Sequence, residues 1–184
     1  LVINLSGVMK ERSQDNVLNK LTRNATGNPG LENTLAAIKK AKDNKDVKGI
    51  YLEAGLFSTD FAPLQELRQA LADFRKSGKW IVAYGETYTQ GTYYLASVAN
   101  KVYLNPQGSL DWHGIAAEPM FVKDLLAKFG IKMQVVKVGK YKSATEMYTE
   151  DKMSDSNREQ VKRYIDGLWG NMCKAVSTSR SISV

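Results

Sequence analysis

Lys142 stands in the stretch VGKYKSATEM, residues 138–147, between a tyrosine and a serine. A neutral lysine amine can act as a general base that activates a serine hydroxyl, and burial favours the neutral form. Glu146 follows four residues later, and on a helix this spacing would give an ordinary exposed ion pair that keeps the lysine protonated. Spacing alone favours the ion pair, because such pairs are common, but it leaves the catalytic interpretation open.

Other residue types that carry chemistry are scarce. His113, in DWHG, is the only histidine and Cys173 the only cysteine, so a two-histidine zinc site, a CxxC site and an internal disulfide are excluded. We expect His113 to be a hydrogen-bonded turn residue, although a Ser-His-Asp triad would have to use it. Cys173 falls on an apolar helical face, which is typical of a core thiol. Because neither GxGxxG nor GxxxxGK[ST] is present, we expect no cofactor, and we expect no metal.

The composition is that of a soluble globular protein. The chain has 184 residues, of which 43% are hydrophobic, and a formal net charge of +7. Its lysines are scattered along the sequence and not gathered into a stripe with exposed aromatics, so we expect no nucleic-acid partner. The length fits one α/β domain. The chain opens at the strand-like LVINLSG without an initiator methionine, and we interpret residues 1–184 as a single domain excised from a longer protein.

Apolar runs alternate with amphipathic helical patterns along the chain. Predicted strands cover residues 2–5, 49–54, 80–85, 101–106 and 132–139, and predicted helices cover residues 32–44, 62–79, 89–100 and 120–130. The polar, Gly- and Asn-rich residues 10–30 indicate a loop. A last long helix begins near residues 154–156, where SNRE fits a capping box. Strands that alternate with helices favour an α/β fold with a mainly parallel sheet flanked by helices.

Three stretches carry a resemblance to a known family: YYLASVANKVYLNPQG at residues 93–108, GKYKSATE at 139–146 and MSDSNRE at 153–159. Together they are similar to the bacterial signal peptide peptidase A family, also called protease IV. The resemblance covers nearly the whole chain and is weakest in residues 8–32. The chain looks like the N-terminal half of the long form, in which two related halves lie in tandem. This implies a Clp protease/crotonase-like fold, a Ser/Lys catalytic dyad and a membrane-associated oligomer.

By this resemblance Lys142, in its KSA context, occupies the position of the general-base lysine. Gln90 stands where the family has its nucleophilic serine, because the SGGYY-like turn reads QGTYY here. Glutamine has no nucleophilic oxygen. Gly55, in a loop expected after the second strand, and Gly91 match the places of the amides that form the oxyanion hole and substrate edge. Ser143 is a candidate to orient the lysine of its own or a neighbouring site.

The missing serine implies a composite site. In long-form members the serine belongs to the C-terminal half, so Lys142 would work with a serine that lies outside this chain. Docking of that half over Tyr141, Met147 and Tyr148 would desolvate the amine and favour its neutral form. Met147 stands where the family usually has proline, a departure that loosens the local turn and leaves the lysine in place.

The first hypothesis for function is therefore the lysine-bearing half of a serine endopeptidase that degrades cleaved signal peptides and similar membrane-associated peptides, inactive as an isolated chain. One alternative is an inert scaffold that assembles its active twin, and a weaker one is a crotonase-like acyl-CoA enzyme. The partners implied are a peptide substrate, the homologous C-terminal half and neighbouring protomers. The resemblance places them on the extracytoplasmic, periplasmic side of a parent protein anchored in the bacterial cell membrane.

Two expectations concern surfaces. We expect the long helix over residues 154–178 to lie at the oligomer interface. A half that packs against a twin should also keep exposed apolar area, with Trp112, Phe121 and the aromatics beside Lys142 as candidates. Lys142 should then lie at the rim of this area, at the carboxyl end of the strand over 132–139.

Overall fold

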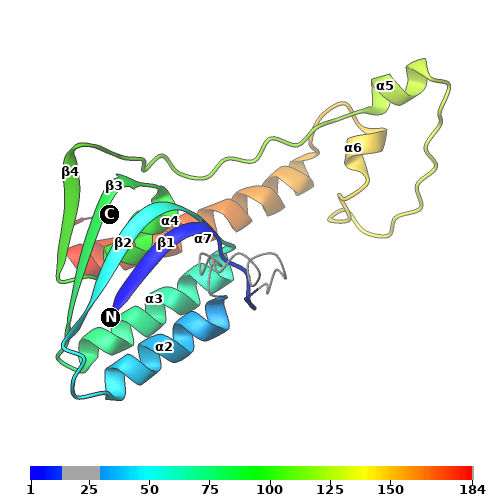
Figure 1. Ribbon diagram of the computed structural model, residues 1–184. Coiled ribbons are helices and arrows are strands. Elements are labelled where there is room, and N and C mark those ends of the chain that lie inside the picture. Colours follow the sequence, from blue (N-terminus) through cyan, green and yellow to red (C-terminus); the bar gives the residue numbers. More distant parts are fainter. Residues whose placement is uncertain (14–29, 184) are drawn as a thin grey trace. The chain divides into compact units, whose positions relative to one another are not determined.

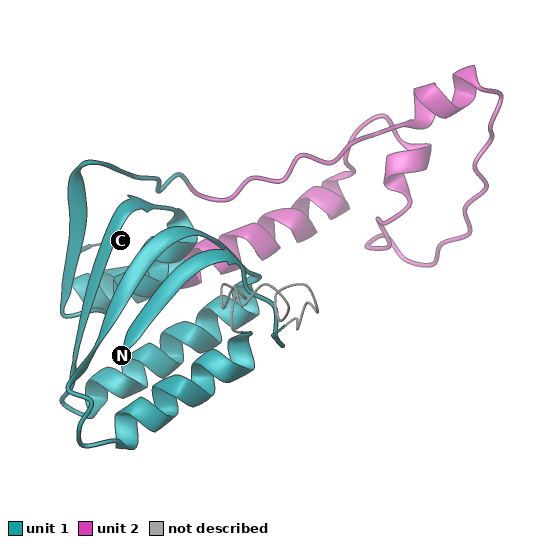
Figure 2. Cartoon of the chain, in the orientation of Figure 1, with its two compact units in different colours: residues 1–113, 172–184 teal, residues 114–171 magenta. Residues whose placement is uncertain are grey.

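The computed structural model describes residues 1–13 and 30–183, so most of the loop expected over residues 10–30 lies outside the described residues. The chain divides into two compact units (Figure 2). Unit 1 consists of residues 1–113 and 172–184, and unit 2 of residues 114–171. The expected single domain over residues 1–184 stays a prediction.

Unit 1 is built on a parallel sheet with strand order β1-β2-β3-β4 (Figure 1). The strands are β1 (Val2–Val8), β2 (Gly49–Ser58), β3 (Trp80–Tyr88) and β4 (Lys101–Leu110). The helices between them are α2 (Leu31–Asp43), α3 (Phe61–Lys76) and α4 (Gln90–Ala96). This alternation confirms the predicted α/β class with a mainly parallel sheet.

The core of unit 1 lies on one face of this sheet. Leu5, Leu52 and Ile81 alternate along their strands with polar or exposed residues, and all three are fully buried. They share the core with Leu67 and Phe74 of α3, also fully buried, as the 3.6-residue apolar period of that helix predicts. The opposite face carries half-buried or exposed side chains, including Val2, Tyr51, Val82, Tyr84 and Tyr103.

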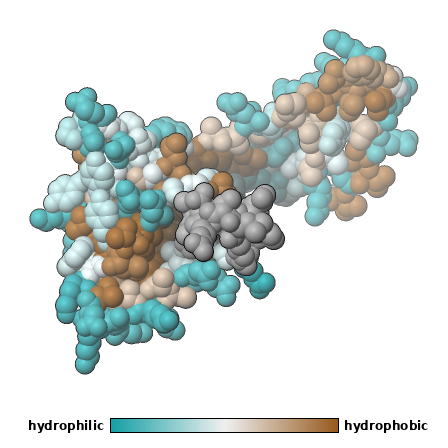
Figure 3. All heavy atoms as spheres, viewed as in Figure 1, coloured by the Kyte–Doolittle hydropathy of each residue, from teal (hydrophilic) through white to brown (hydrophobic). Residues whose placement is uncertain are grey.

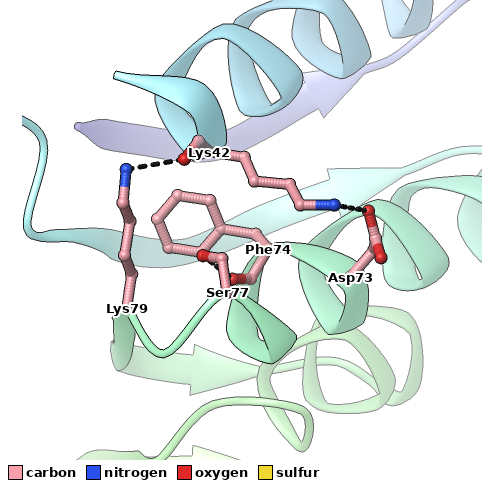
Figure 4. A network of polar contacts seen from close by, with 5 residues as sticks. All are labelled: Lys42, Asp73, Phe74, Ser77 and Lys79. Atoms are coloured by element: carbon pink, nitrogen blue, oxygen red, sulfur yellow. Dashed lines mark hydrogen bonds and ion pairs between the residues drawn. The ribbon is translucent and has the colours of Figure 1, made fainter. Parts of the chain in front are cut away.

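Polar contacts connect α2 to α3 and to Lys79, the residue before β3 (Figure 4). Lys42 Nζ contacts Asp73 Oδ2 at 2.5 Å, and the Lys42 ammonium lowers the pKa of that carboxyl. Lys79 Nζ donates to the carbonyl oxygens of Ala41, Lys42 and Asn44 at 2.7, 2.7 and 2.6 Å. The Lys79 side chain therefore caps the carboxyl end of α2, where unpaired carbonyls and the helix dipole favour a cation.

Bulges distort the carboxyl ends of two strand pairs. In the first, Leu5 pairs with Ala54 and Gly7 with Phe57, so two residues of β2, Gly55 and Leu56, face one residue of β1. Gly55 thus lies inside β2, and its expected place in a loop after the strand was wrong. The bulge keeps the strand paired as far as Ser58.

The second irregularity explains how β4 accommodates a proline. The predicted strand ended at Pro106, but β4 continues to Leu110. Gly85 pairs with Leu104 and Thr87 with Ser109, so residues 105–108 fall out of register with β3. Pro106 lies in this unpaired part, where its missing N–H costs no ladder hydrogen bond.

Unit 2 contains α5 (Lys123–Lys128), α6 (Glu146–Thr149) and the first part of α7 (Asp155–Arg180), whose residues from Met172 on belong to unit 1. The predicted strand over residues 132–139 was wrong, since this segment has no strand assignment. Its apolar run fits a strand, but no neighbouring strand pairs with it among the described residues. Val136 and Val138 are consequently 100% and 86% exposed.

The start of α7 differs in detail from the expected capping box. Ser154 precedes the helix, and its Oγ accepts a hydrogen bond from the backbone N–H of Asn157 at 3.2 Å. The N-cap is therefore Ser154, two residues before the serine of SNRE. Along α7 only Met172 and Val176 are buried, whereas Tyr164 is 66% exposed.

Candidate functional site

Lys142 lies in a tight turn of unit 2 that precedes α6. The backbone N–H of Lys142 donates to the carbonyl oxygen of Gly139 at 3.3 Å, which closes the turn. Gly139 has φ +93°, a conformation that side-chain-bearing residues rarely adopt. The GKYK sequence thus forms this turn because a glycine starts it, and the turn presents Lys142 to solvent.

A groove of about 530 Å³ runs beside the lysine. It is lined by Val136, Lys137, Val138, Tyr141, Lys142, Ser143, Ala144 and Thr145. In Figure 3 hydrophobic residues reach the visible surface of unit 2 among hydrophilic ones. Lys142 is exposed within this mainly apolar surrounding, but no strand ends beside it, which corrects its expected position at the carboxyl end of residues 132–139.

The residues beside Lys142 contact the first turns of α7. Ser143 Oγ donates to Gln160 Oε1 at 3.4 Å, and Tyr141 OH donates to Glu159 Oε2 at 3.3 Å. Ser143 lines the same groove as Lys142, but its hydroxyl has a partner on α7. The hypothesis that Ser143 orients a lysine stays a prediction.

Glu146 does not form the exposed helical pair that its spacing from Lys142 suggested. Helix α6 begins only at Glu146, so Lys142 precedes the helix, and the glutamate is 2% exposed. Its carboxylate accepts hydrogen bonds from Ser154 and Asn157. Burial raises the pKa of this carboxyl, but these hydrogen bonds outweigh burial and leave the pKa below its usual value.

Gln90 lies in unit 1, as the first residue of α4, and Thr89 separates it from the end of β3. Thr89 caps the helix by accepting from the backbone N–H of Thr92 at 3.3 Å. Gln90 and Gly91 line a pocket of about 180 Å³ together with Phe57, Ser58, Thr59, Phe61, Leu64 and Met172. Both residues thus lie at the amino end of α4, within the helix that the sequence predicts over residues 89–100.

The two glycines of the predicted oxyanion hole have different surroundings. A Cβ on Gly91 would meet the methyl groups of Leu64 at 3.8 Å, an ordinary contact. A Cβ on Gly55 would lie 3.1 Å from the carbonyl oxygen of Leu5, so Gly55 permits the close approach of β1 and β2 at the bulge. Gly91 borders the pocket at Gln90, whereas Gly55 has a strand-pairing role.

His113 makes the kind of hydrogen bond that was expected, whereas Cys173 is less buried than the core thiol that was expected. His113 Nδ1 lies 2.7 Å from Asp111 Oδ1 in an exposed stretch, so the expectation of a hydrogen-bonded histidine is confirmed. Cys173 is half-buried, and burial raises the pKa of its thiol. It lines an apolar pocket of about 310 Å³ whose walls include Tyr93 and Trp112.

Within the described part of the chain, no three His, Cys, Asp or Glu side chains gather as a metal site would need. No helix among residues 1–13 and 30–183 combines the length and apolar character needed to cross a bilayer.

The segment that carries both Gln90 and Lys142 is also the part that matches a known family. Residues 73–184 match Peptidase family S49. The chain belongs to this family. The parallel α/β architecture of unit 1 agrees with the Clp protease-like fold that the resemblance implied. A family of peptidases also favours the peptidase hypothesis over an acyl-CoA enzyme.

Three relatives are similar over most of the chain. Protease 4 of Salmonella typhi is 40% identical over 100% of this chain and 31% of its own length. Protease 4 of Haemophilus influenzae is 36% identical over 79% of this chain and 24% of its own length. The chloroplastic serine protease SPPA of Arabidopsis thaliana is 30% identical over 76% of this chain and 20% of its own length. The chain thus spans less than a third of the length of these relatives.

One feature of the Lys142 region was missed by sequence reasoning. The glutamate was treated only as an ion-pair partner of Lys142, whereas it binds Ser154 and Asn157. A signal was present, because Ser154 and Asn157 are three residues apart at the start of a helix and therefore face the same side of its first turn.

Proposed function

We propose that this chain is the lysine-bearing half of a serine endopeptidase in which Lys142 is the general base of a Ser/Lys dyad. The observation that carries the proposal is the exposed Lys142 in an apolar groove, on a turn whose GKYKSA sequence resembles that of the family's catalytic lysine. The amine in this groove is desolvated when another surface covers it, and desolvation favours the neutral form that can accept a proton.

The nucleophile in this proposal comes from outside the chain. Gln90 occupies the position that resembles the catalytic serine, and an amide side chain cannot form an acyl-enzyme. The relatives are more than three times as long as the matched region, which leaves room for a second half that supplies the serine. Lys142 would accept the proton of that serine and return it to the leaving amine.

The proposal extends to the setting of the parent protein. Its substrates are cleaved signal peptides and similar membrane-associated peptides, bound where the C-terminal half and neighbouring protomers close over the Lys142 groove. The parent is a membrane-anchored homo-oligomer with its peptidase domains on the extracytoplasmic side, and residues 154–178 contribute to the interface. The largely exposed Tyr164 and the half-buried Ile165 on α7 support that last point.

Replacement of Lys142 by alanine in the full-length protein tests the proposal. We expect Lys142→Ala to lower kcat/KM toward a fluorogenic peptide by roughly 10²–10⁴-fold, the usual contribution of a general base, with an unchanged oligomer. The matched control is Lys140→Ala, because Lys140 lies in the same turn with its Nζ 4.9 Å from the ring centroid of Tyr141. Undiminished turnover by Lys142→Ala would remove the lysine from the mechanism.

A second candidate function is an inert scaffold that promotes assembly of an active twin. Gln90 favours it, because a half that lacks a nucleophile needs no catalytic groups of its own. The same variant separates the two functions. Full activity of Lys142→Ala, combined with loss of activity when the half is deleted, would establish the scaffold.

A further inference from the structure

Glu146 is the buried carboxylate of unit 2 and has no part in the proposed proton transfer. Among the described residues it is the only buried Asp or Glu, at 2% exposed. A buried charge is costly unless hydrogen bonds replace its water, so its partners indicate what the position is for.

The side chain of Glu146 is bound to the start of α7. Its Oε1 accepts from Ser154 Oγ at 2.6 Å. Its Oε2 accepts from the backbone N–H of Ser154 at 3.2 Å and from Asn157 Nδ2 at 2.9 Å. Three donors thus satisfy one carboxylate beside the positive end of the helix dipole, and bonds to a charged acceptor are stronger than neutral ones.

The main chain of Glu146 is bound in the other direction, to the segment that carries the lysine. Its backbone N–H donates to the carbonyl oxygen of Ser143 at 3.0 Å, and Ser143 directly follows Lys142. Glu146 therefore joins the Lys142 turn to the first turn of α7. The other contacts of the turn to α7, from Tyr141 and Ser143, are longer, at 3.3 and 3.4 Å, and exposed.

We propose that Glu146 is a positioning residue, which holds the Lys142 turn against the first turn of α7 through Ser154 and Asn157. The proposal rests on the proposed function of Lys142 as a base. A general base must lie within hydrogen-bond reach of the proton it accepts, so a turn that shifts by about 1 Å loses rate although substrate contacts are kept. Glu146 itself touches neither substrate nor the reacting atoms.

The test compares Glu146→Gln, Asn157→Ala and Lys142→Ala in the full-length protein. In Glu146→Gln the side-chain NH₂ group would face a donor of Ser154 or Asn157 and could not accept its hydrogen bond. We therefore expect kcat to fall about 10- to 100-fold, with KM within about 2-fold of wild type. Asn157→Ala removes one donor and leaves the Ser154 cap in place. We expect it to lower kcat about 3-fold.

Glu150→Gln is the matched control. This substitution removes the same negative charge as Glu146→Gln, but at an exposed residue at the end of α6. We expect it to keep the kcat of wild type. Oligomer size and thermal unfolding are measured for each variant, and if Glu146→Gln does not assemble, Asn157→Ala decides the question.

The positioning role would be overturned by wild-type kcat in Glu146→Gln, or in Asn157→Ala if Glu146→Gln does not assemble. A rise in KM alone, or an equal loss of kcat in Glu150→Gln, would overturn it as well. The proposed function fails separately, through an active Lys142→Ala. A slow Glu146→Gln beside an inactive Lys142→Ala supports both proposals, and a wild-type Glu146→Gln beside an inactive Lys142→Ala rejects the positioning role alone.

Discussion

Arg68 of α3 donates a hydrogen bond from Nη2 to the hydroxyl of Ser179, near the end of α7, at 2.7 Å. The same guanidinium donates to the carbonyl oxygens of Ala175 and Tyr94 and to Ser97 Oγ, and it lies 4.5 Å from the centroid of the Tyr94 ring. All of these partners are neutral. They lie toward the carboxyl ends of α4 and α7, where the helix dipoles favour a positive charge.

Loss of the Arg68 side chain should therefore destabilise unit 1. Arg68→Met keeps an apolar stem but removes the charge-assisted hydrogen bonds to these four oxygens, although Ser97 Oγ still donates to the Tyr94 carbonyl oxygen at 2.9 Å. We therefore expect the free energy of unfolding to fall by about 1.5–3 kcal/mol. Urea unfolding of the chain, followed by tryptophan fluorescence, measures this. Arg75→Met is the control, because Arg75 is exposed on the same helix and makes one bond, to Val98 O. Equal losses in the two variants would contradict the special role of Arg68.

Tyr88 predicts how stability depends on alkaline pH. Its ring is 1% exposed, its hydroxyl donates to the carbonyl oxygen of Tyr103 at 3.1 Å, and burial raises the pKa of its phenol to about 12. The raised pKa stabilises the folded state fully below the unfolded value of about 10, and this stability is lost as the pH rises toward 12.

We expect Tyr88→Phe to lower the free energy of unfolding by about 1 kcal/mol at pH 8, because the Tyr103 carbonyl oxygen loses its hydrogen-bond donor. Between pH 10 and about 12 the free energy of unfolding of the wild type should fall by about 3 kcal/mol more than that of the variant. Urea unfolding of both proteins at several pH values tests this. Parallel stability curves would show that the Tyr88 phenol does not contribute.

The isolated chain should not react as a serine hydrolase. In the proposed function Gln90 stands at the position of the nucleophile, and the Ser143 hydroxyl donates to Gln160 on α7. We expect no labelling by a fluorophosphonate probe and no peptidase activity, measured by mass spectrometry and with a fluorogenic peptide. Stoichiometric labelling that Lys142→Ala blocks would show that a local serine is a nucleophile, with Ser143 as the first position to map.

Exposed apolar side chains near Lys142 predict self-association of the isolated chain. Val136 and Val138 are almost fully exposed, and Tyr141 is 43% exposed. Trp112 and Phe121, also expected to be exposed, are half-buried instead. We expect oligomers by light scattering at about 100 μM, since stable contacts bury about 800 Å² per partner. Val136→Lys combined with Val138→Lys should shift the chain toward monomer. A wild-type chain that is monomeric at this concentration would argue against assembly through this surface.

The strands and helices of unit 1 were largely predictable from the sequence. Leu5, Leu52 and Ile81 lie in short apolar runs, and Leu67 and Phe74 recur with the helical period, so local pattern and burial agree. The strand over residues 132–139 was predicted from the same kind of run and did not form. A strand also needs a partner, and an apolar run alone does not supply one.

The roles of the candidate site residues stay predictions, and their geometry was only partly predictable from the sequence. Gln90 was placed correctly because the turn before α4 follows directly from the end of β3. Glu146 was assigned to an exposed helical pair because its spacing from Lys142 is four residues, yet the helix begins only at Glu146. Spacing predicts facing side chains only when both residues lie on one helix.

The segment around Val136 and Val138, which pairs with no strand among the described residues, bears on how long the protein persists in the cell. An extended, exposed and apolar stretch is the form in which proteases and chaperones recognise unfolded chains. A newly made chain with this stretch uncovered is therefore open to quality control. An assembly that covers the stretch would remove this signal, so we expect unassembled copies to be degraded faster than assembled ones.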